Sequence, residues 1–347
     1  PLKGKLVRIG IFDHLDRRAV SLQRYYADRL ELVALYDRLG FHAYHVAEHH
    51  CTPLGMAPSP SVFLSAVAQR TSRLKFGPLV YTLPLYHPLR VAEEICMLDH
   101  MSQGRLQVGV GRGISPIEVG YYGVDPAQAQ AKYLESYAVL MQALTQDVVD
   151  HEGEFFRFRN VPVELRPLQE PHPPIWYGVG NAEGADWCVA NGINAVVNGP
   201  IPRVREITDR FRSRWAASGQ TVEALPLIGT SRHIVVGTSD AQARALAERA
   251  YACWYASFMF LWNRHGSAPQ FAPFLPTFAE AERLGLAVAG SATTVQRMLS
   301  EQIDQTGVNY LLCRFAFGDL TLAESAASVE RFAAEVMPAL CDEAVPA

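Results

Sequence analysis

Three polar residues, Glu48, His49 and His50, directly follow the apolar run 43–47 and are the first candidates for chemistry. Histidine titrates near neutral pH, so it can act as a general acid or base, or it can bind a metal. Neighbouring side chains on a strand point to opposite faces, so His49 and His50 share a metal only if the strand has already ended. Other histidines do not lie at clear strand ends in metal-ligand spacing; they are His87, His100 and His233. We therefore favour an acid–base role over a metal site, with a hydrogen-bonded structural histidine as the alternative.

Arg112 is a candidate anion-binding residue because it lies between Gly111 and Gly113. Glycine lets the backbone approach a ligand closely. A guanidinium group suits a bidentate contact with phosphate. The alternative is an ordinary surface arginine, since most arginines are exposed.

A second candidate anion site is the segment Gly178, Gly180, Asn181 and Ala182, which leads into an expected helix. Free N–H groups and the helix dipole at such a helix start favour a phosphate. The segment lacks the further glycines and the acidic residue of a dinucleotide-binding fingerprint. It is a weak motif by itself.

Short β-rich runs alternate with segments of helical period along the chain. The expected strands are 7–12, 43–47, 74–83, 105–111, 174–179, 194–198, 227–236 and 310–317. The expected helices are 21–39, 61–70, 89–101, 129–144, 182–191, 202–217, 240–258 and 325–340. Eight strand–helix units in one direction predict an α/β fold, the (β/α)8 TIM barrel, as a single domain over residues 1–347. Such barrels carry their active sites at the C-terminal ends of the strands, where the candidates above would meet.

The run from about 260 to 290 fits no strand–helix unit and lies between the seventh helix and the eighth strand. A long segment of this kind in a compact barrel predicts a lid-like insertion. Several aromatic side chains precede it and could line a pocket beneath the lid or pack on the seventh helix. They are Trp254, Tyr255, Phe258, Phe260 and Trp262.

The composition excludes several classes of partner. The formal net charge of −4 gives no reason to expect nucleic acid or an anionic membrane surface. No apolar run approaches the ~20 residues of a membrane span. The 6 cysteines form no CxxC pair, which predicts a reduced, cytoplasmic protein.

Three blocks of sequence, 47–52, 83–90 and 98–105, resemble the bacterial luciferase family of flavin-dependent monooxygenases, and the similarity runs nearly end to end. The resemblance implies an enzyme that receives reduced FMN from a separate reductase. With O2, it would oxygenate a small, apolar organic substrate. It also implies a homodimer formed through the second and third barrel units.

The resemblance implies roles for the candidate residues. His49 would lie at the reactive edge of the flavin as acid or base, with His50 as a second catalytic candidate, and Glu48 would support the ring or a backbone amide. Arg112 would bind near the flavin phosphate. The phosphate-binding turn corresponds to Gly178, Gly180, Asn181 and Ala182.

The third strand end also corresponds to a family feature. The bond between Leu79 and Val80 matches a non-proline cis peptide under the flavin, although composition alone equally fits an ordinary buried strand. Asp99 and Arg105 bracket a helix end at the far end of the barrel and are better interpreted as structural partners.

Two departures argue against light emission: a shorter loop before the last strand, and Gln130 where the light-emitting subunit carries an arginine. Three alternatives to an FMN monooxygenase remain. They are a deazaflavin-dependent oxidoreductase of the same superfamily, a non-catalytic flavin-binding protein, and a metal-dependent barrel hydrolase.

Overall fold

The computed structural model of the protein describes residues 7–269 and 275–341. Its strands are β1 (Arg8–Asp13), β2 (Ala43–Val46), β3 (Lys75–Pro78), β4 (Tyr81–Thr82), β5 (Val108–Gly111), β6 (Val148–Glu152), β7 (Arg157–Pro162), β8 (Ile175–Gly178), β9 (Asn194–Val196), β10 (Ile228–Val236), β11 (Ala287–Gly290) and β12 (Tyr310–Arg314). Its α-helices are α1 (Leu22–Arg38), α2 (Pro60–Arg70), α3 (Pro88–Met101), α4 (Pro116–Tyr121), α5 (Ala129–Thr145), α6 (Ala182–Ala190), α7 (Ile201–Ala217), α8 (Asp240–Arg264), α9 (Phe278–Arg283), α10 (Ala292–Thr306), α11 (Leu322–Arg331) and α12 (Met337–Leu340). In addition, η1 (Leu83–Leu85) is a short 3-10 helix and η2 (Phe332–Val336) is a short π-helix.

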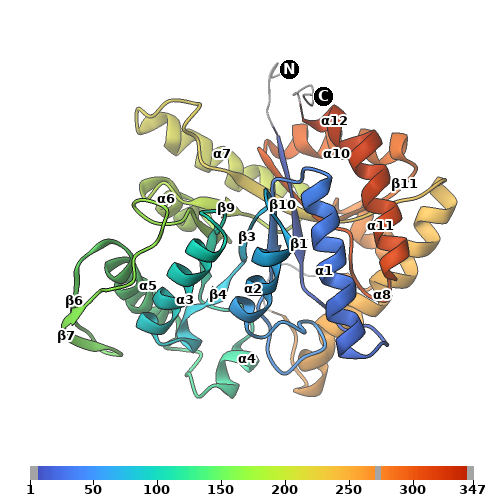
Figure 1. The fold of residues 1–347 in the computed structure, drawn as a ribbon. Coiled ribbons are helices and arrows are strands. Elements are labelled where there is room, and N and C mark those ends of the chain that lie inside the picture. Colours follow the sequence, from blue (N-terminus) through green and yellow to red (C-terminus); the bar gives the residue numbers. More distant parts are fainter. Residues whose placement is uncertain (1–6, 270–274, 342–347) are drawn as a thin grey trace.

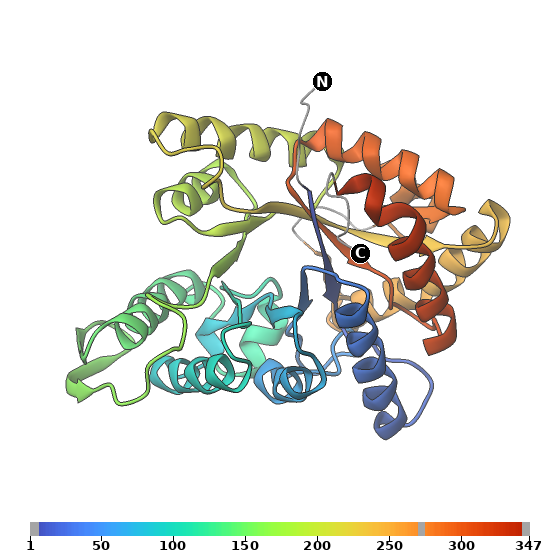
Figure 2. The ribbon, with the colours of Figure 1, turned by 45° about the horizontal axis from the view of Figure 1, so that its top comes forward.

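The strands form a nearly closed parallel barrel in the order β3-β2-β1-β12-β10-β9-β8-β5-β4. β3 and β4 stand at the two ends of this order, yet only Leu79 and Val80 separate them in the chain. A parallel bridge between Phe76 and Leu106 joins β3 to the segment before β5. The run 75–82 is therefore one interrupted strand that closes the ring. Eight barrel positions result, which confirms the TIM-barrel prediction, and helices surround the strands (Figures 1 and 2).

Large aromatic side chains fill the N-terminal half of the barrel. The hydroxyl of Tyr310 lies 3.0 Å from Nε2 of His45, and the indole N–H of Trp176 donates to a side-chain oxygen of Gln107 at 3.0 Å. A Cβ atom on Gly10 of β1 would lie 1.8 Å from the Tyr310 oxygen. Glycine in the strand thus makes the room that the tyrosine occupies. Within the described barrel, the space for a ligand lies at the opposite, C-terminal end.

The segment predicted as an insertion contains α9 and β11, and α10, which follows β11, was also not among the expected helices. α8 runs on to Arg264, and β11 pairs in parallel with the second half of β10, along residues 233–236. The first part of β10 pairs with β9 and β12 in the barrel. Sequence analysis missed β11 because its sequence, Ala-Val-Ala-Gly, has one β-branched residue and a glycine. Residues 270–274 of the predicted lid lie outside the described residues, and lid motion remains a prediction.

A hairpin and a short helix were also not expected. β6 and β7 form an antiparallel hairpin within the stretch that the sequence left irregular, and it projects from the barrel beside α5 (Figure 1). α4 follows β5 as a short helix at the barrel mouth. No helix within residues 7–269 and 275–341 is long and apolar enough to cross a membrane.

Asp99 and Arg105 have structural roles, as predicted. Arg105 donates to the carbonyl oxygens of Ala68 and Leu74, at 2.8 and 3.0 Å. Asp99 accepts the backbone N–H of Gln169 at 2.8 Å. These bonds join loops at the N-terminal end of the barrel, away from the candidate site.

Candidate active site

A cavity of about 480 Å³ lies at the C-terminal ends of the barrel strands. Residues from β1, β4, β5, β8 and β12, from the segment after β2, and from the break between β3 and β4, line its wall. Eight of the ten predicted site residues are among them: Glu48, His49, Leu79, Val80, Arg112, Gly178, Gly180 and Asn181. Ala182 follows Asn181 as the first residue of α6, and His50 lines a small recess beside the cavity. Because they lie at C-terminal strand ends, nearly all of the candidates line or adjoin one cavity.

His49 is held by a carboxylate that the sequence did not reveal. Its Nδ1 lies 3.1 Å from Oε1 of Glu118, and Oε2 of Glu118 accepts the backbone N–H of His50 at 2.7 Å. A carboxylate accepts hydrogen bonds, so Nδ1 of His49 carries the proton. In the neutral ring Nε2 then bears the lone pair. His49 thus meets the cavity with a nitrogen that can accept a proton.

Glu118 belongs to α4 and remains ionised at neutral pH. Burial acts to raise the pKa of Glu118, but the charge and hydrogen bond of His49 and the N–H of His50 outweigh it, and the pKa is lowered. α4 begins with Pro116, and the side chain of Ser115 accepts the backbone N–H of Glu118 at 3.3 Å. The start of α4 therefore holds the carboxylate of Glu118 in place, and this carboxylate in turn orients His49.

Glu48 and His50 form a second network beside the cavity. Nε2 of His50 lies 2.9 Å from Oε1 of Glu48, and its Nδ1 lies 2.9 Å from the hydroxyl of Tyr122. Oε2 of Glu48 accepts from the hydroxyl of Tyr86 at 2.7 Å and from the backbone N–H of Thr82 at 3.3 Å. Glu48 therefore supports a backbone amide, as predicted. Both ring nitrogens of His50 have protein partners, which gives it a positioning geometry, and a catalytic role for it remains a prediction.

The peptide between Leu79 and Val80 is cis, as the resemblance implied. Glycines of β5 make room for this break in the barrel wall. A Cβ on Gly109 would lie 2.9 Å from Cα of Leu79, and a Cβ on Gly111 would lie 2.6 Å from a methyl of Val80. The Val-Gly-Val-Gly sequence of β5 thus lets the two residues pack against it, at the cavity wall.

The turn between β8 and α6 presents unpaired backbone donors. The side chain of Asn181 caps α6 by accepting the N–H of Gly184 at 2.9 Å. The first helical N–H groups lack partners within a helix, so those of Ala182 and Glu183 are available to an anion. A Cβ on Gly178 or Gly180 would meet no atom within 4 Å. The turn therefore faces open space.

Two arginines flank this turn. Arg112 is exposed and lines the cavity, and Arg203 of α7 donates to the carbonyl oxygen of Gly180. Sequence analysis identified Arg112 but not Arg203, since a helical arginine gives no local sign of the loop that it contacts. Together with the α6 amides they form a site suited to a phosphate group.

Several other lining residues were missed. His14 directly follows β1, and Arg314 is the last residue of β12. Both therefore lie at C-terminal strand ends, the position that identified the other candidates. The remaining wall is mainly apolar or aromatic and includes Phe12, Leu54, Ile114, Tyr177 and Phe258. Of the five predicted aromatics, Trp254 is fully buried, Phe258 lines the cavity and Phe260 is exposed. Gln130 and Asn198 add polar groups to the wall.

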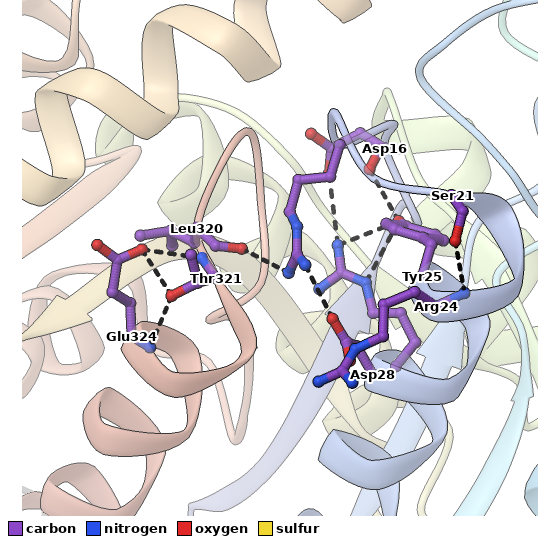
Figure 3. Close-up of polar contacts among 10 residues, drawn as sticks. Asp16, Ser21, Arg24, Tyr25, Asp28, Leu320, Thr321 and Glu324 are labelled. Carbon is purple, nitrogen blue, oxygen red and sulfur yellow. Dashed lines mark hydrogen bonds and ion pairs between the residues drawn. The ribbon is translucent and has the colours of Figure 1, made fainter.

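Hydrogen bonds hold the loop that carries His14 against the loop after β12. Oδ2 of Asp16 accepts the backbone N–H of Gly318 at 2.6 Å, and Arg18 donates to the carbonyl oxygen of Leu320 at 3.0 Å. Figure 3 shows the contact to Leu320 and the bond from the hydroxyl of Tyr25 to the carbonyl oxygen of Asp16, from which the contacts continue into α1. These bonds tie the loop that carries His14, which lines the cavity, to the loop after β12.

Within the described ranges, no group of three or more His, Cys, Asp or Glu side chains is arranged to hold a metal ion. The histidines near the cavity instead bond to carboxylates, a tyrosine or a tryptophan.

Comparison with known proteins places the chain among related sequences. A sequence model described as luciferase-like monooxygenase matches residues 7–303. The protein y4wF of Sinorhizobium fredii is 47% identical over 337 residues, which cover 97% of this chain and 98% of that protein. The oxygenase component of flavin-dependent trigonelline monooxygenase from Acinetobacter baylyi is 28% identical over 247 residues, covering 70% and 68%.

Solved structures share the fold. The monooxygenase RslO1 from Streptomyces bottropensis has a TM-score of 0.86 at 24% identity, covering 95% of this chain and 99% of that one. The oxygenating constituent of 3,6-diketocamphane monooxygenase from Pseudomonas putida, in complex with FMN, has a TM-score of 0.80 at 18% identity, covering 96% and 98%. An F420-dependent secondary alcohol dehydrogenase has a TM-score of 0.74 at 17% identity, covering 96% and 99%. At these identities the likeness concerns the fold alone.

Proposed function

The chain belongs to the luciferase-like monooxygenase family, and from this premise we propose that it uses reduced FMN and O2 to oxygenate a small, mainly apolar organic molecule. One observation carries the proposal. A single cavity has a carboxylate-held histidine, His49, on one wall and a turn with free backbone N–H groups, at the start of α6, on another. A flavin mononucleotide requires both a phosphate site and a site for chemistry at its ring.

The residues of the cavity fit a flavin. Arg112, Arg203 and the amides of Ala182 and Glu183 would bind its phosphate, since Arg112 lines the cavity and the other donors lie at the turn between β8 and α6. The cis peptide after Leu79 and the apolar wall would receive the ring. A bound reduced flavin supplies the electrons with which O2 is activated.

The protein's own contribution would be proton handling and water exclusion. His49 would exchange a proton at Nε2, while Glu118 holds the ring and keeps the proton at Nδ1. The apolar side chains of Phe12, Leu54 and Phe258 would keep water from the reacting atoms. The same wall favours a largely apolar substrate.

A separate reductase would supply the reduced flavin. The chain has no dinucleotide-binding fingerprint of its own. The Acinetobacter baylyi relative is named as the oxygenase component of its enzyme, which supports a two-component arrangement here. The 6 free cysteines support a reducing, cytoplasmic location.

A deazaflavin-dependent oxidoreductase is the second candidate. The F420-dependent alcohol dehydrogenase with a TM-score of 0.74 favours it, since its fold accommodates that cofactor. A phosphate site like the one beside Arg112 would suit either cofactor. A flavin-binding protein without turnover is a third possibility, and the Glu118–His49 pair argues against it, because mere binding requires no oriented base.

The deciding experiment is anaerobic titration of the protein with photoreduced FMN, followed by rapid mixing with oxygenated buffer while absorbance is recorded. We expect the oxidised-flavin band to return much more slowly than for free flavin. Return at the free-flavin rate would contradict the FMN proposal, and the titration would then be repeated with a reduced deazaflavin. His49→Asn should accelerate the return. His151→Asn is the matched control, because His151 bonds Glu135 at 3.1 Å on the remote hairpin.

A further inference from the structure

Arg314 is a buried cation at the mouth of the barrel. It is the last residue of β12, and Tyr310, Leu312 and Arg314 share one face of that strand because side chains alternate. Tyr310 and Leu312 pack inside the barrel, so Arg314 lies on the interior face above them. Its side chain lines the cavity, yet the residue is only 4% exposed.

No carboxylate among residues 7–269 and 275–341 forms an ion pair with Arg314. One guanidinium nitrogen, Nη2, donates to the hydroxyl of Ser231 at 2.8 Å, and that hydroxyl in turn donates to Asn198 at 2.6 Å. Nε of Arg314 is buried without a partner. Burial lowers the pKa of Arg314 to about 10, which still leaves it charged at neutral pH. Asp16 is the acidic group whose charge acts on Arg314, but it forms no ion pair with it, and its own pKa is raised to about 7. A buried charge without an ion-pair partner is costly, so the site favours an anion.

Aromatic rings orient the guanidinium and a neighbouring histidine. The guanidinium carbon of Arg314 lies 4.8 Å from the ring centre of Phe12 and 5.8 Å from that of Trp254. These contacts offset part of the desolvation of the charge. His14 packs on the same two rings, at 5.0 Å from Phe12 and 5.8 Å from Trp254. Arg314 and His14 are therefore neighbours on one wall.

His14 offers a second donor. The indole N–H of Trp254 donates to Nδ1 of His14 at 3.3 Å, so Nδ1 is the nitrogen without a proton. Burial, followed by the charge of Arg314, lowers the pKa of His14 well below its usual value and keeps the ring neutral. The proton of a neutral ring then lies on Nε2. His14 lines the cavity with an N–H group beside the guanidinium.

This pair lies across the barrel from the phosphate-binding turn. With β3 and β4 counted as one strand, the ring order is β1, β2, β3–β4, β5, β8, β9, β10, β12. β12 is four positions from β5, which carries Arg112 beyond its end. Arg112 and Arg314 thus face the cavity from opposite sides. A flavin phosphate held at Arg112 leaves Arg314 to another anion.

We propose that Arg314 and His14 form a subsite for the oxyanion of the substrate, so that the enzyme acts on an organic acid, with a carboxylate at this wall. The apolar body of the acid would extend toward His49, whose ring lies 5.6 Å from that of His14. That the bound acid is a substrate rests on the proposed function. The anion subsite itself exists whether or not FMN is the cofactor.

The test uses small acids and their neutral analogues as probes. Benzoate, hexanoate and benzenesulfonate are titrated calorimetrically into the protein, with and without saturating FMN, and compared with benzamide and hexanamide. We expect at least one carboxylate to bind about 10- to 100-fold more tightly than its amide. Stronger binding of the sulfonate would identify a larger oxyanion as the preferred group. Binding in the absence of FMN separates this result from a failure of the FMN proposal.

Variants locate the binding site. Arg314→Met should abolish the preference for the acid, Arg314→Lys should keep part of it, and Arg112→Met should leave it intact. His14→Phe should weaken binding more than His14→Gln, which retains a donor. The proposal is overturned if no acid binds better than its amide, or if Arg314→Lys and Arg314→Met bind the acid as the wild type does. It is equally overturned if Arg314→Met weakens FMN binding as much as Arg112→Met does.

Discussion

Oε1 of Glu118 lies 3.1 Å from Nδ1 of His49, although 69 positions separate the two residues in the chain. The second oxygen of the same carboxylate accepts the N–H of His50 at 2.7 Å. One side chain therefore fixes the tautomer of the candidate base and the backbone that carries it. Glu118 is a positioning residue, because it acts through His49.

Glu118→Gln should lower the rate of substrate oxygenation without preventing flavin binding. Glutamine keeps the size of the side chain but lacks the charge, and its amide can offer a donor to Nδ1 of His49. The ring would then be free to adopt the other tautomer. We expect a loss of about 10-fold or more, smaller than the ~10²–10⁴ that a general base contributes. The pH profile of the rate should also change, which a purely structural role would not predict.

Glu135→Gln provides the control for this variant. Glu135 also lies 3.1 Å from a histidine nitrogen, that of His151, and it accepts backbone N–H groups in the hairpin. The two substitutions are chemically identical. Equal effects on the oxygenation rate would show that the loss at Glu118 comes from stability and not from the orientation of His49.

Arg112→Met should weaken FMN binding while leaving riboflavin binding nearly unchanged. The two ligands differ by the phosphate that Arg112 is proposed to bind, and a charged hydrogen bond contributes about 1.5–3 kcal/mol. Fluorescence titration of both flavins measures the difference. Arg297→Met is a suitable control, since Arg297 is an exposed arginine paired with Glu301. A parallel loss of riboflavin affinity would place Arg112 at the ring or in the fold instead.

The barrel was predictable from local signals because each strand has a strong β-forming run and each barrel position repeats the same unit. Even the interrupted strand was expected as the single run 74–83, which contains β3, β4 and the cis peptide after Leu79. β11 escaped because Ala287, Ala289 and Gly290 carry little β propensity. Its place beside β10 depends on tertiary pairing that a local pattern does not reveal.

The candidate site was predictable where position in a barrel decides function. His49, Arg112 and the turn at Gly178 follow strand ends, so the topology alone brings them together. Glu118 lies in a short helix after β5, and its role depends on a contact 69 positions away. Local spacing has no access to such a contact. His14 and Arg314 were missed for a different reason, since the sequence prediction considered the ends of other strands and not those of β1 and β12.

Val62→Lys should disrupt self-association if the protein forms the homodimer that its resemblance to the luciferase family implies. Val62 on α2 is 73% exposed, and Met97 and Met101 on the adjacent α3 are also exposed apolar side chains. Exposed apolar side chains on a surface favour association, and a buried lysine would oppose it. Light scattering after gel filtration measures the mass. Val222→Lys is the control, because Val222 is 77% exposed in the loop before β10. A wild-type monomer, or a dimer unaffected by Val62→Lys, would contradict an interface at α2 and α3.

The pH dependence of stability should carry a contribution from Asp16. Burial raises the pKa of Asp16 from 3.8 to about 7, against the opposing charge of Arg29 and the N–H of Gly318. Between about pH 4 and pH 7 the folded protein therefore holds a proton at Asp16 that the unfolded chain has lost. The free energy of unfolding falls as the pH rises through this window, and the fall ends above the folded pKa.

Asp16→Asn removes the titrating group and should remove this fall. Relative to the variant, the wild type should lose stability steadily from about pH 4 to about pH 7, at up to about 1.4 kcal/mol per pH unit, and no further above that range. Urea unfolding of both proteins at several pH values measures the difference. A constant offset between the two proteins, from the altered bond to Gly318, does not affect the slope. A difference in the opposite direction would show that Asp16 is ionised in the fold and that its pairing with Arg29, at 3.9 Å, outweighs its burial.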